Sequence, residues 1–206
     1  MGLLGGSFNP PHAGHLAMAR AAREQAGLDE VWLIPAARPP HKPDHPDMAS
    51  PEDRLEMTRL AVRDQPGLGV CDVELSRSGP SYTIDTVREL KRAHPEASFA
   101  WIVGADSVDE LPTWRSAAEL LREVEVVVVT RPGHDLEQNL AVVERALGPW
   151  AAAALRRRVV VVEAAVSSTE VREQVRAGAR GWEARVPAPV ADLIRARGLY
   201  GHRRSA

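Results

Sequence analysis

The chain opens with MGLLGGSFNPPHAGHLA (Met1–Ala17), in which a short apolar segment runs through paired glycines toward a helical pattern. We expect a strand at Met1–Leu4 and a helix that starts near Gly14. The glycines permit a sharp turn with close backbone approach, and the unpaired N–H groups at the start of a helix attract an anion. This segment therefore predicts an α/β fold with a phosphate site directly after its first strand.

Strand-like and helix-like segments alternate along the rest of the chain. Short β-branched runs predict strands, and apolar residues at helical spacing predict the helices between them. Such alternation leads to parallel pairing with right-handed crossovers, so we expect a doubly wound, mostly parallel Rossmann-like sheet with helices on both faces. The expected strands are Met1–Leu4, Val31–Ile34, Val70–Leu75, Ser98–Val103, Glu125–Thr130 and Val159–Val162, and the expected helices are Gly14–Ala26, Pro51–Asp64, Thr83–Ala93, Ala117–Glu123, Leu136–Leu147, Ser168–Ala177 and Pro189–Arg197.

Composition limits the class of protein. The 206 residues suffice for one substantial core, and we expect a single domain over residues 1–206. With a net charge of -2 and a sequence pI of about 6.4, the chain has no global positive field for nucleic acid or an anionic membrane. Its one cysteine, Cys71, excludes an internal disulfide and suits a reducing compartment, and no stretch is long and apolar enough to cross a bilayer. We expect a cytoplasmic protein.

His12 and His15 flank Gly14 at the expected switch from strand to helix. A zinc site would need further ligands, and neither an HExxH helix nor a cysteine pair supplies them. Purely structural histidines are the other alternative. Because both side chains stand at a helix N-terminus, we interpret them as phosphate-binding residues, and we expect no metal ion held by the protein itself.

A second candidate anion site follows the expected strand Val159–Val162, at Ser167–Arg172. Ser167 and Glu170 have the spacing of a capping box, and helix capping alone accounts for them. Arg172 is different, because a cation near the N-terminus of a helix has the unfavourable sign for the helix dipole unless an anion lies between. We therefore expect Arg172 to face a phosphate.

The segment 36–51 contains five prolines and cannot form regular structure. It carries Lys42, one of only two lysines in a chain whose other basic side chains are arginines and histidines. A long basic loop beside an anion site is typical of a lid over phosphates, and a mobile surface loop is the alternative.

These motifs together resemble those of a known superfamily. His12-Ala13-Gly14-His15 and Ser167–Arg172 are similar to the HxGH and SSTxxR motifs of nucleotidyltransferases that transfer AMP or CMP onto phosphates. Further motifs narrow the resemblance to one family; these are Pro40–Pro43, Pro80–Thr86, Gly104–Asp106, Trp114, Arg131–Gly133 and Gly198–Tyr200. With them the chain resembles the bacterial nicotinate-mononucleotide adenylyltransferases over essentially Met1–Tyr200. Ser7 and Asn9 stand where Thr and Asp are frequent in that family.

The resemblance implies a reaction and a set of residues. The 5′-phosphate of nicotinate mononucleotide would attack the α-phosphorus of ATP in line, giving deamido-NAD and pyrophosphate in NAD biosynthesis, with Mg²⁺ arriving on ATP. The implied catalytic residues are His12, His15, Lys42 and Arg172; the implied ATP-binding residues are Gly5, Gly6, Ser7, His12, His15, Gly104, Asp106, Ser168 and Arg172; the implied mononucleotide-binding residues are Tyr82, Thr83 and Trp114.

Several alternatives stay open at this stage. The amide mononucleotide or another phosphorylated small molecule could replace the acid as acceptor, and a nucleotide-binding protein without turnover could keep the fold. Trp114 could be a core residue instead of a stacking platform, and Thr83 could cap a helix. The expected partners are two small-molecule substrates, with no nucleic acid and no membrane, and assembly into a homo-oligomer is left undecided.

Overall fold

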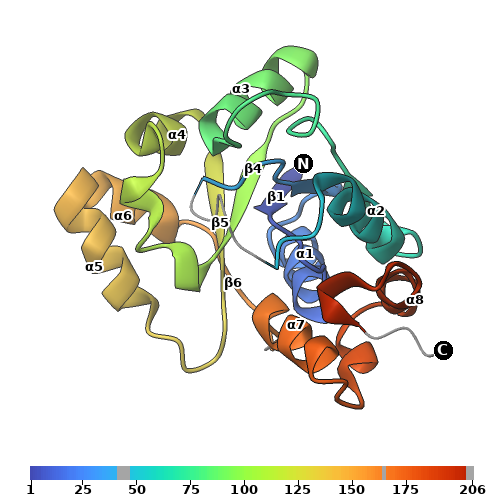
Figure 1. The fold of residues 1–206 in the computed structure, drawn as a ribbon. Coiled ribbons are helices and arrows are strands. Elements are labelled where there is room, and N and C mark those ends of the chain that lie inside the picture. Colours follow the sequence, from blue (N-terminus) through green and yellow to red (C-terminus); the bar gives the residue numbers. More distant parts are fainter. Residues whose placement is uncertain (41–46, 164–165, 203–206) are drawn as a thin grey trace.

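The computed structural model describes residues 1–40, 47–163 and 166–202. In this part of the chain six strands pair in parallel to form a sheet of order β3-β2-β1-β4-β5-β6, which confirms the predicted doubly wound class (Figure 1). The strands are β1 (Gly2–Gly6), β2 (Val31–Pro35), β3 (Leu68–Val70), β4 (Ala100–Gly104), β5 (Glu125–Thr130) and β6 (Val159–Val161).

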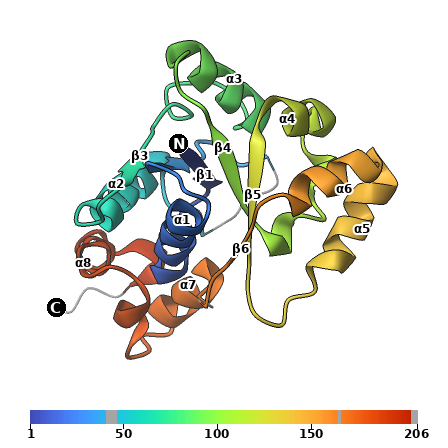
Figure 2. The ribbon, with the colours of Figure 1, turned by 180° about the vertical axis from the view of Figure 1, so that it is seen from behind.

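Helices cover both faces of this sheet, as Figures 1 and 2 show from opposite sides. Successive strand residues point to opposite faces, so Leu4 packs in one core and Leu3 in the other. The Leu4 core is closed by α1 (Ala13–Gln25), α2 (Pro51–Val62), α7 (Ser168–Arg176) and α8 (Ala188–Arg197), and the Leu3 core by α3 (Thr83–Ala93), α4 (Ala117–Glu123), α5 (Leu136–Leu147) and α6 (Pro149–Arg156).

The expected strand Val70–Leu75 is wrong. Strand β3 ends at Val70, and a turn follows in which the Leu75 N–H donates to the Asp72 carbonyl at 2.9 Å. The Glu74 side chain turns inward there, and the Thr86 hydroxyl donates to its carboxyl at 2.6 Å. Because β3 is an edge strand, it pairs with β2 alone. Beyond Val70 the chain leaves the sheet, and the hydrogen bond between Glu74 and Thr86 fixes its course.

Helix α6 was not predicted. It starts at Pro149 directly after α5, and Gly148 at φ +94 makes the break between the two helices. Proline is favoured in the first turn of a helix and glycine tolerates a positive φ, so the pair Gly148-Pro149 ends one helix and begins the next.

The strand order reverses between β1 and β4, where ligands bind in sheets of this kind. At the end of β1, Gly5 leaves room for a side chain of the neighbouring strand β4. A Cβ atom on Gly5 would stand 2.5 Å from the Trp101 ring of β4, well inside contact distance. Gly5 therefore lets the Trp101 indole pack against β1 beside the reversal point.

No helix in the described residues has the length and apolar character that crossing a membrane requires.

Candidate active site

Two cavities adjoin at the carboxyl ends of the strands. The first cavity, of 580 Å³, is lined from the loop after β1, from the residues after β4 and β5, and from the start of α7. The second cavity, of 520 Å³, lies among the segments after β1 and β2, the start of α3 and the segment before α4. Gly6 and Ser7 line both cavities, so the two meet at the loop between β1 and α1.

His12 and His15 form a reciprocal capping box at the start of α1. The His15 N–H donates to the His12 Nδ1 at 3.3 Å, and the His12 N–H donates to the His15 Nδ1 at 3.2 Å. The two rings stack with their centroids 3.7 Å apart. Gly14 leaves room between them, because a Cβ atom there would stand only 3.0 Å from the His12 ring and 3.2 Å from the Val166 carbonyl, and both would have to give way slightly.

The capping box also sets the protonation of both rings. Since each Nδ1 accepts a backbone hydrogen bond, the ring proton of the neutral form resides on Nε2. Burial lowers the pKa of His12 to about 4, and burial together with the neighbouring His12 lowers the pKa of His15 well below its usual value. Both imidazoles are neutral at pH 7 and keep one N–H donor each on residues that line the first cavity.

The loop before α1 is held in a strained shape that supports His15. Phe8 has a φ of +45, which non-glycine residues rarely adopt, and it is buried with 1% of its surface exposed. Its ring meets the His15 ring edge-on at 4.9 Å between centroids. The strained backbone of Phe8 therefore lies where its ring fixes the His15 ring beside the first cavity.

The start of α7 docks onto the same loop. The Ser168 hydroxyl donates to the Pro10 carbonyl at 3.0 Å, and Arg172 donates to the Asn9 carbonyl at 2.9 Å. Ser167 caps the helix by accepting from the Glu170 N–H at 3.1 Å, as predicted, but the Glu170 carboxylate pairs with Arg185 at 2.8 Å instead of completing a box. Ser168 and Arg172 thus line the first cavity together with the two histidines.

Asn9 gathers distant segments around the first cavity. Its amide N–H₂ donates to the Asp47 carbonyl at 2.9 Å, while its Oδ1 accepts from the Ala49 N–H at 3.0 Å and from the Tyr200 hydroxyl at 2.9 Å. Burial raises the pKa of Tyr200, so this hydroxyl remains a donor. An aspartate at position 9 would have no N–H for Asp47, so the amide found here suits the network.

The second cavity brings together the residues expected at the mononucleotide. Tyr82 precedes α3 and Thr83 is its first residue, so Thr83 is not the helix cap. The Tyr82 N–H already donates to the Pro80 carbonyl at 3.1 Å. Trp114 is half-buried in the cavity wall, and its buried Nε1–H makes no hydrogen bond within the described residues.

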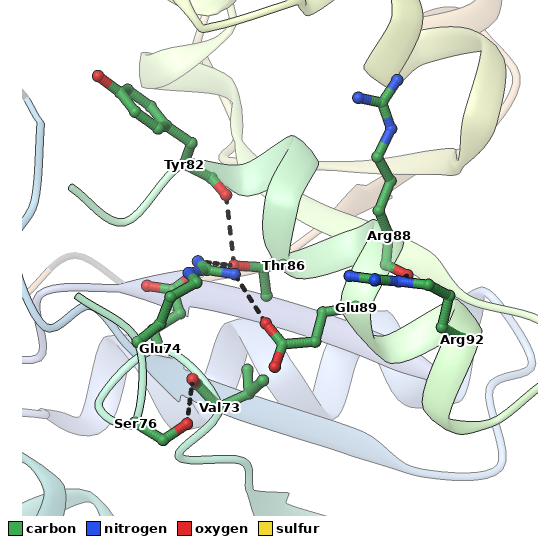
Figure 3. Close-up of polar contacts among 9 residues, drawn as sticks. Val73, Glu74, Ser76, Tyr82, Thr86, Arg88, Glu89 and Arg92 are labelled. Carbon is green, nitrogen blue, oxygen red and sulfur yellow. Dashed lines mark hydrogen bonds and ion pairs between the residues drawn. The ribbon is translucent and has the colours of Figure 1, made fainter. Parts of the chain in front are cut away.

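A partly buried polar network joins this wall to the turn after β3 (Figure 3), and one of its members, Glu74, lines the second cavity itself. The Thr86 hydroxyl, fully buried in the first turns of α3, donates to Glu74 at 2.6 Å and accepts from Arg77 at 2.8 Å. Arg77 also pairs with Glu89 at 3.0 Å. Burial raises the pKa of the Glu74 carboxyl, although hydrogen bonds from Thr86 and Ser81 oppose the shift. The network ties the turn after β3 to the residues that begin α3.

Most of the predicted site residues lie on one of the two cavities. Ser7, His12, His15, Asp106, Ser168 and Arg172 line the first, and Tyr82, Thr83 and Trp114 line the second. Gly5 faces the second cavity, not the first. Gly104 lines neither, but a Cβ atom on it would stand 3.0 Å from the Asp106 carboxylate, so its role is to leave room. Lys42 lies outside the described residues.

Sequence reasoning missed two arginines at these cavities. Arg131 follows β5 and lines the first cavity, and Arg115 lines the second with its guanidinium 4.7 Å from the centre of the Tyr82 ring. The Arg131-Pro132-Gly133 motif was a signal for the former. Arg115 has no local signal in a chain this rich in arginine. The described residues hold no group of three or more His, Cys, Asp or Glu that could bind a metal ion.

Comparisons with known proteins define the class and then the family. A family model described as cytidylyltransferase-like matches residues 3–174, which include every residue that lines the two cavities. A probable nicotinate-nucleotide adenylyltransferase of Gloeobacter violaceus is 46% identical over 202 residues, covering 97% of this chain and 95% of the relative. A probable nicotinate-nucleotide adenylyltransferase of Geobacillus kaustophilus is 41% identical over 203 residues, covering 98% of this chain and 87% of the relative. The chain belongs to the nicotinate-nucleotide adenylyltransferase family.

A solved structure shares the fold at low identity. The Plasmodium falciparum nicotinic acid mononucleotide adenylyltransferase, complexed with NaAD, aligns with a TM-score of 0.78 at 16% identity, over 99% of this chain and 98% of the other. The two chains therefore share their overall fold.

The neutral His12 imidazole predicts a loss of stability in mild acid. Its pKa is about 4 in the folded protein and 6.5 for an ordinary histidine, so the unfolded chain binds the proton more tightly and stability falls as the pH drops below 6.5. From pH 7 to pH 5 we expect His12 to cost about 2 kcal/mol in the free energy of unfolding, measured by denaturant titration.

The substitution His12→Asn keeps a capping acceptor and should shrink the difference between the two pH values by about 2 kcal/mol. His94→Asn, at an exposed histidine, is the matched control and should keep the wild-type difference. A His12→Asn variant that loses as much stability as the wild type would show that His12 is not buried in its neutral form.

Proposed function

We propose that this chain joins ATP and nicotinate mononucleotide to give deamido-NAD and pyrophosphate, in the biosynthesis of NAD. The observation that carries the proposal is the pair of cavities that share Gly6 and Ser7. Two substrates bound on either side of this loop would bring their phosphates together at it. The names of the relatives, and the NaAD bound by the Plasmodium enzyme of the same fold, support this pairing of substrates.

We assign the first cavity to ATP. The N-terminus of α1 and the Nε2–H groups of His12 and His15 would donate to the α-phosphate side, where negative charge builds up. Arg172 and Lys42 would hold the β- and γ-phosphates and the departing pyrophosphate. Asp106 would bind the ribose, beside the space that Gly104 leaves, and Ser168 would help to seat the nucleotide.

We assign the second cavity to the mononucleotide. Trp114 would stack on the pyridine ring, and the Thr83 N–H at the start of α3 would donate to the carboxylate. Because the Tyr82 N–H already has the Pro80 carbonyl as its acceptor, it would need to change partner to join in. Arg115, above the Tyr82 ring, adds a positive charge to the cavity that receives an anionic acceptor.

The reaction needs little from the protein beyond placement. The attacking group is a phosphate whose second pKa lies near 6, so it is largely ionised at neutral pH and needs no general base. The barrier comes from bringing two polyanions into line, and it is lowered by fixed donors and cations. The proposed step is direct attack on the α-phosphorus, with pyrophosphate as the leaving group.

Mg²⁺ would enter with ATP, held chiefly by phosphate oxygens and water. The donor set fits this, because Asp106 is the one carboxylate among the described residues that line the first cavity. We place the enzyme in the cytoplasm, because its single cysteine cannot form an internal disulfide and this suits a reducing compartment.

The decisive experiment compares acceptors. Purified protein with ATP and Mg²⁺ should release pyrophosphate with nicotinate mononucleotide, and do so at a higher kcat/KM than with nicotinamide mononucleotide, because N–H donors and Arg115 favour a carboxylate over an amide. A reversed preference would assign the amide as the substrate. No pyrophosphate with either would refute adenylyl transfer to a pyridine nucleotide.

His15→Ala should reduce kcat by about 100-fold or more, since it removes one donor to the charge that develops at the α-phosphate. Loss of the cap should cost only about 1 kcal/mol of stability, so the variant remains folded. Steady-state kinetics and thermal melting measure the two effects, with exposed His94→Ala as the control. Turnover close to that of the wild type would remove His15 from the mechanism.

Trp114→Ala should act on the acceptor alone. Loss of the stacking surface should raise the KM for the mononucleotide by about 10-fold, with the KM for ATP nearly unchanged. Trp150→Ala is the matched control, because Trp150 is 37% exposed on α6 and lines neither cavity. If the two tryptophan variants had the same KM for the mononucleotide, the stacking assignment would be wrong.

A further inference from the structure

Arg54, on α2, is the most deeply buried charged side chain in the described part of the chain, with 1% of its surface exposed. Arginine is rarely buried without an acidic partner. No carboxylate within the described residues lies within ion-pair distance of it; the ion pairs that α2 does form there involve Asp53, Glu56 and Arg59 instead. Burial lowers the pKa of the guanidinium, but the charges of Glu52 and Glu74 oppose the shift, and the group remains protonated at neutral pH. A buried positive charge thus lies among backbone groups.

Its hydrogen bonds all go to backbone carbonyls of segments that shape the site. Nη1 donates to Ser7 at 2.9 Å and to Ala36 at 2.6 Å, Nη2 donates to Ala37 at 3.1 Å, and Nε donates to Ala49 at 3.1 Å. One planar group therefore joins the loop after β1 to the segment after β2 and to the residue before the cap of α2.

These segments meet where the two cavities adjoin. Ser7 lines both cavities, Ala36 lines the second, and Met48, next to Ala49, lines the first. A side chain that fixes all three backbones at once sets the distance between the two cavities. In the reaction this distance decides whether the acceptor phosphate reaches the α-phosphorus in line, and an error of about 1 Å can cost about 100-fold in rate.

The charge of Arg54 adds a second effect. Carbonyl oxygens satisfy its N–H groups but leave the net charge in place, and a charge in a medium of low dielectric acts over a longer range than one in water. Both proposed substrates bring phosphates to the loop that Arg54 holds. Their negative charge would stabilise the buried cation, and the cation would in turn favour their binding.

We propose that Arg54 is a positioning residue for adenylyl transfer, which fixes the Ser7, Ala36 and Ala49 backbones at the junction of the two cavities and supplies a buried positive charge to both phosphate-bearing substrates. This inference rests on the proposed function. Arg54 lines neither cavity, so it would act through the backbone it holds and through the field of its charge.

The test compares Arg54→Met, Arg54→Lys and the matched control Arg59→Met. Arg59 is on the same helix, with its side chain 58% exposed and paired with Asp72. Each variant is assayed for kcat, for the KM of ATP and of the mononucleotide, and for the rise in melting temperature that each substrate alone produces.

Arg54→Met removes both the charge and the hydrogen bonds. We expect kcat to fall by about 100-fold and the melting shifts with both substrates to shrink. Lysine keeps the charge but cannot span four carbonyls, so Arg54→Lys should recover most of the melting shifts while kcat stays about 10-fold below the wild type. Arg59→Met should match the wild type in every constant.

A merely structural role would lower the melting temperature of Arg54→Met and leave its kinetic constants and substrate-induced shifts at wild-type values, which would overturn the proposal. Equal substrate-induced shifts in the Lys and Met variants would refute the contribution of charge. If the Met variant does not fold, wild-type kcat in Arg54→Lys refutes the positioning role. Should the wild type itself form no dinucleotide, the proposed function fails, and the melting shift with ATP alone still tests Arg54.

Discussion

The reciprocal hydrogen bonds between His12 and His15 join the fold to the chemistry. They end the loop after β1, begin α1, and leave each ring with a single N–H donor on the first cavity. The same pair of residues thus caps the helix and, in the proposed mechanism, donates hydrogen bonds to phosphate. A neutral donor suits a site that must bind and then release a polyanion, because it stabilises developing charge without the full attraction of a cation.

The positive charge of the site is local and comes from few residues. The chain as a whole carries a net charge of -2, so attraction to phosphates cannot come from a general field. Arg172 and Arg131 line the first cavity, Arg115 lines the second, and Arg54 is buried behind the loop the two cavities share. Placing each cation on a different element lets the fold, and not the composition, determine where two anions come together.

The site is also held by contacts between segments far apart in the chain. Asn9 accepts from Tyr200 near the C-terminal end of the described residues, and its own carbonyl accepts from Arg172. Ala49, fixed by both Asn9 and Arg54, connects this network to the base of the segment after β2. The loop after β1 is therefore the point at which α2, α7 and the C-terminal turn are all tied to the sheet. Its shape depends on contacts from segments far apart in the chain.

Local sequence determined the elements and the motifs: seven of the helices were predicted within two residues, because their apolar spacing, caps and breaks lie in the chain itself. His12, His15, Ser168 and Arg172 were also identified from spacing and resemblance. Long-range packing decided the rest. The end of β3 at Val70 depends on Glu74 finding Thr86, the placement of Gly5 depends on Trp101, and the buried position of Arg54 depends on carbonyls from three separate segments. Nothing in the residues next to Arg54 distinguishes it from the exposed Arg59 five positions on, because burial is a property of what the chain brings around a side chain.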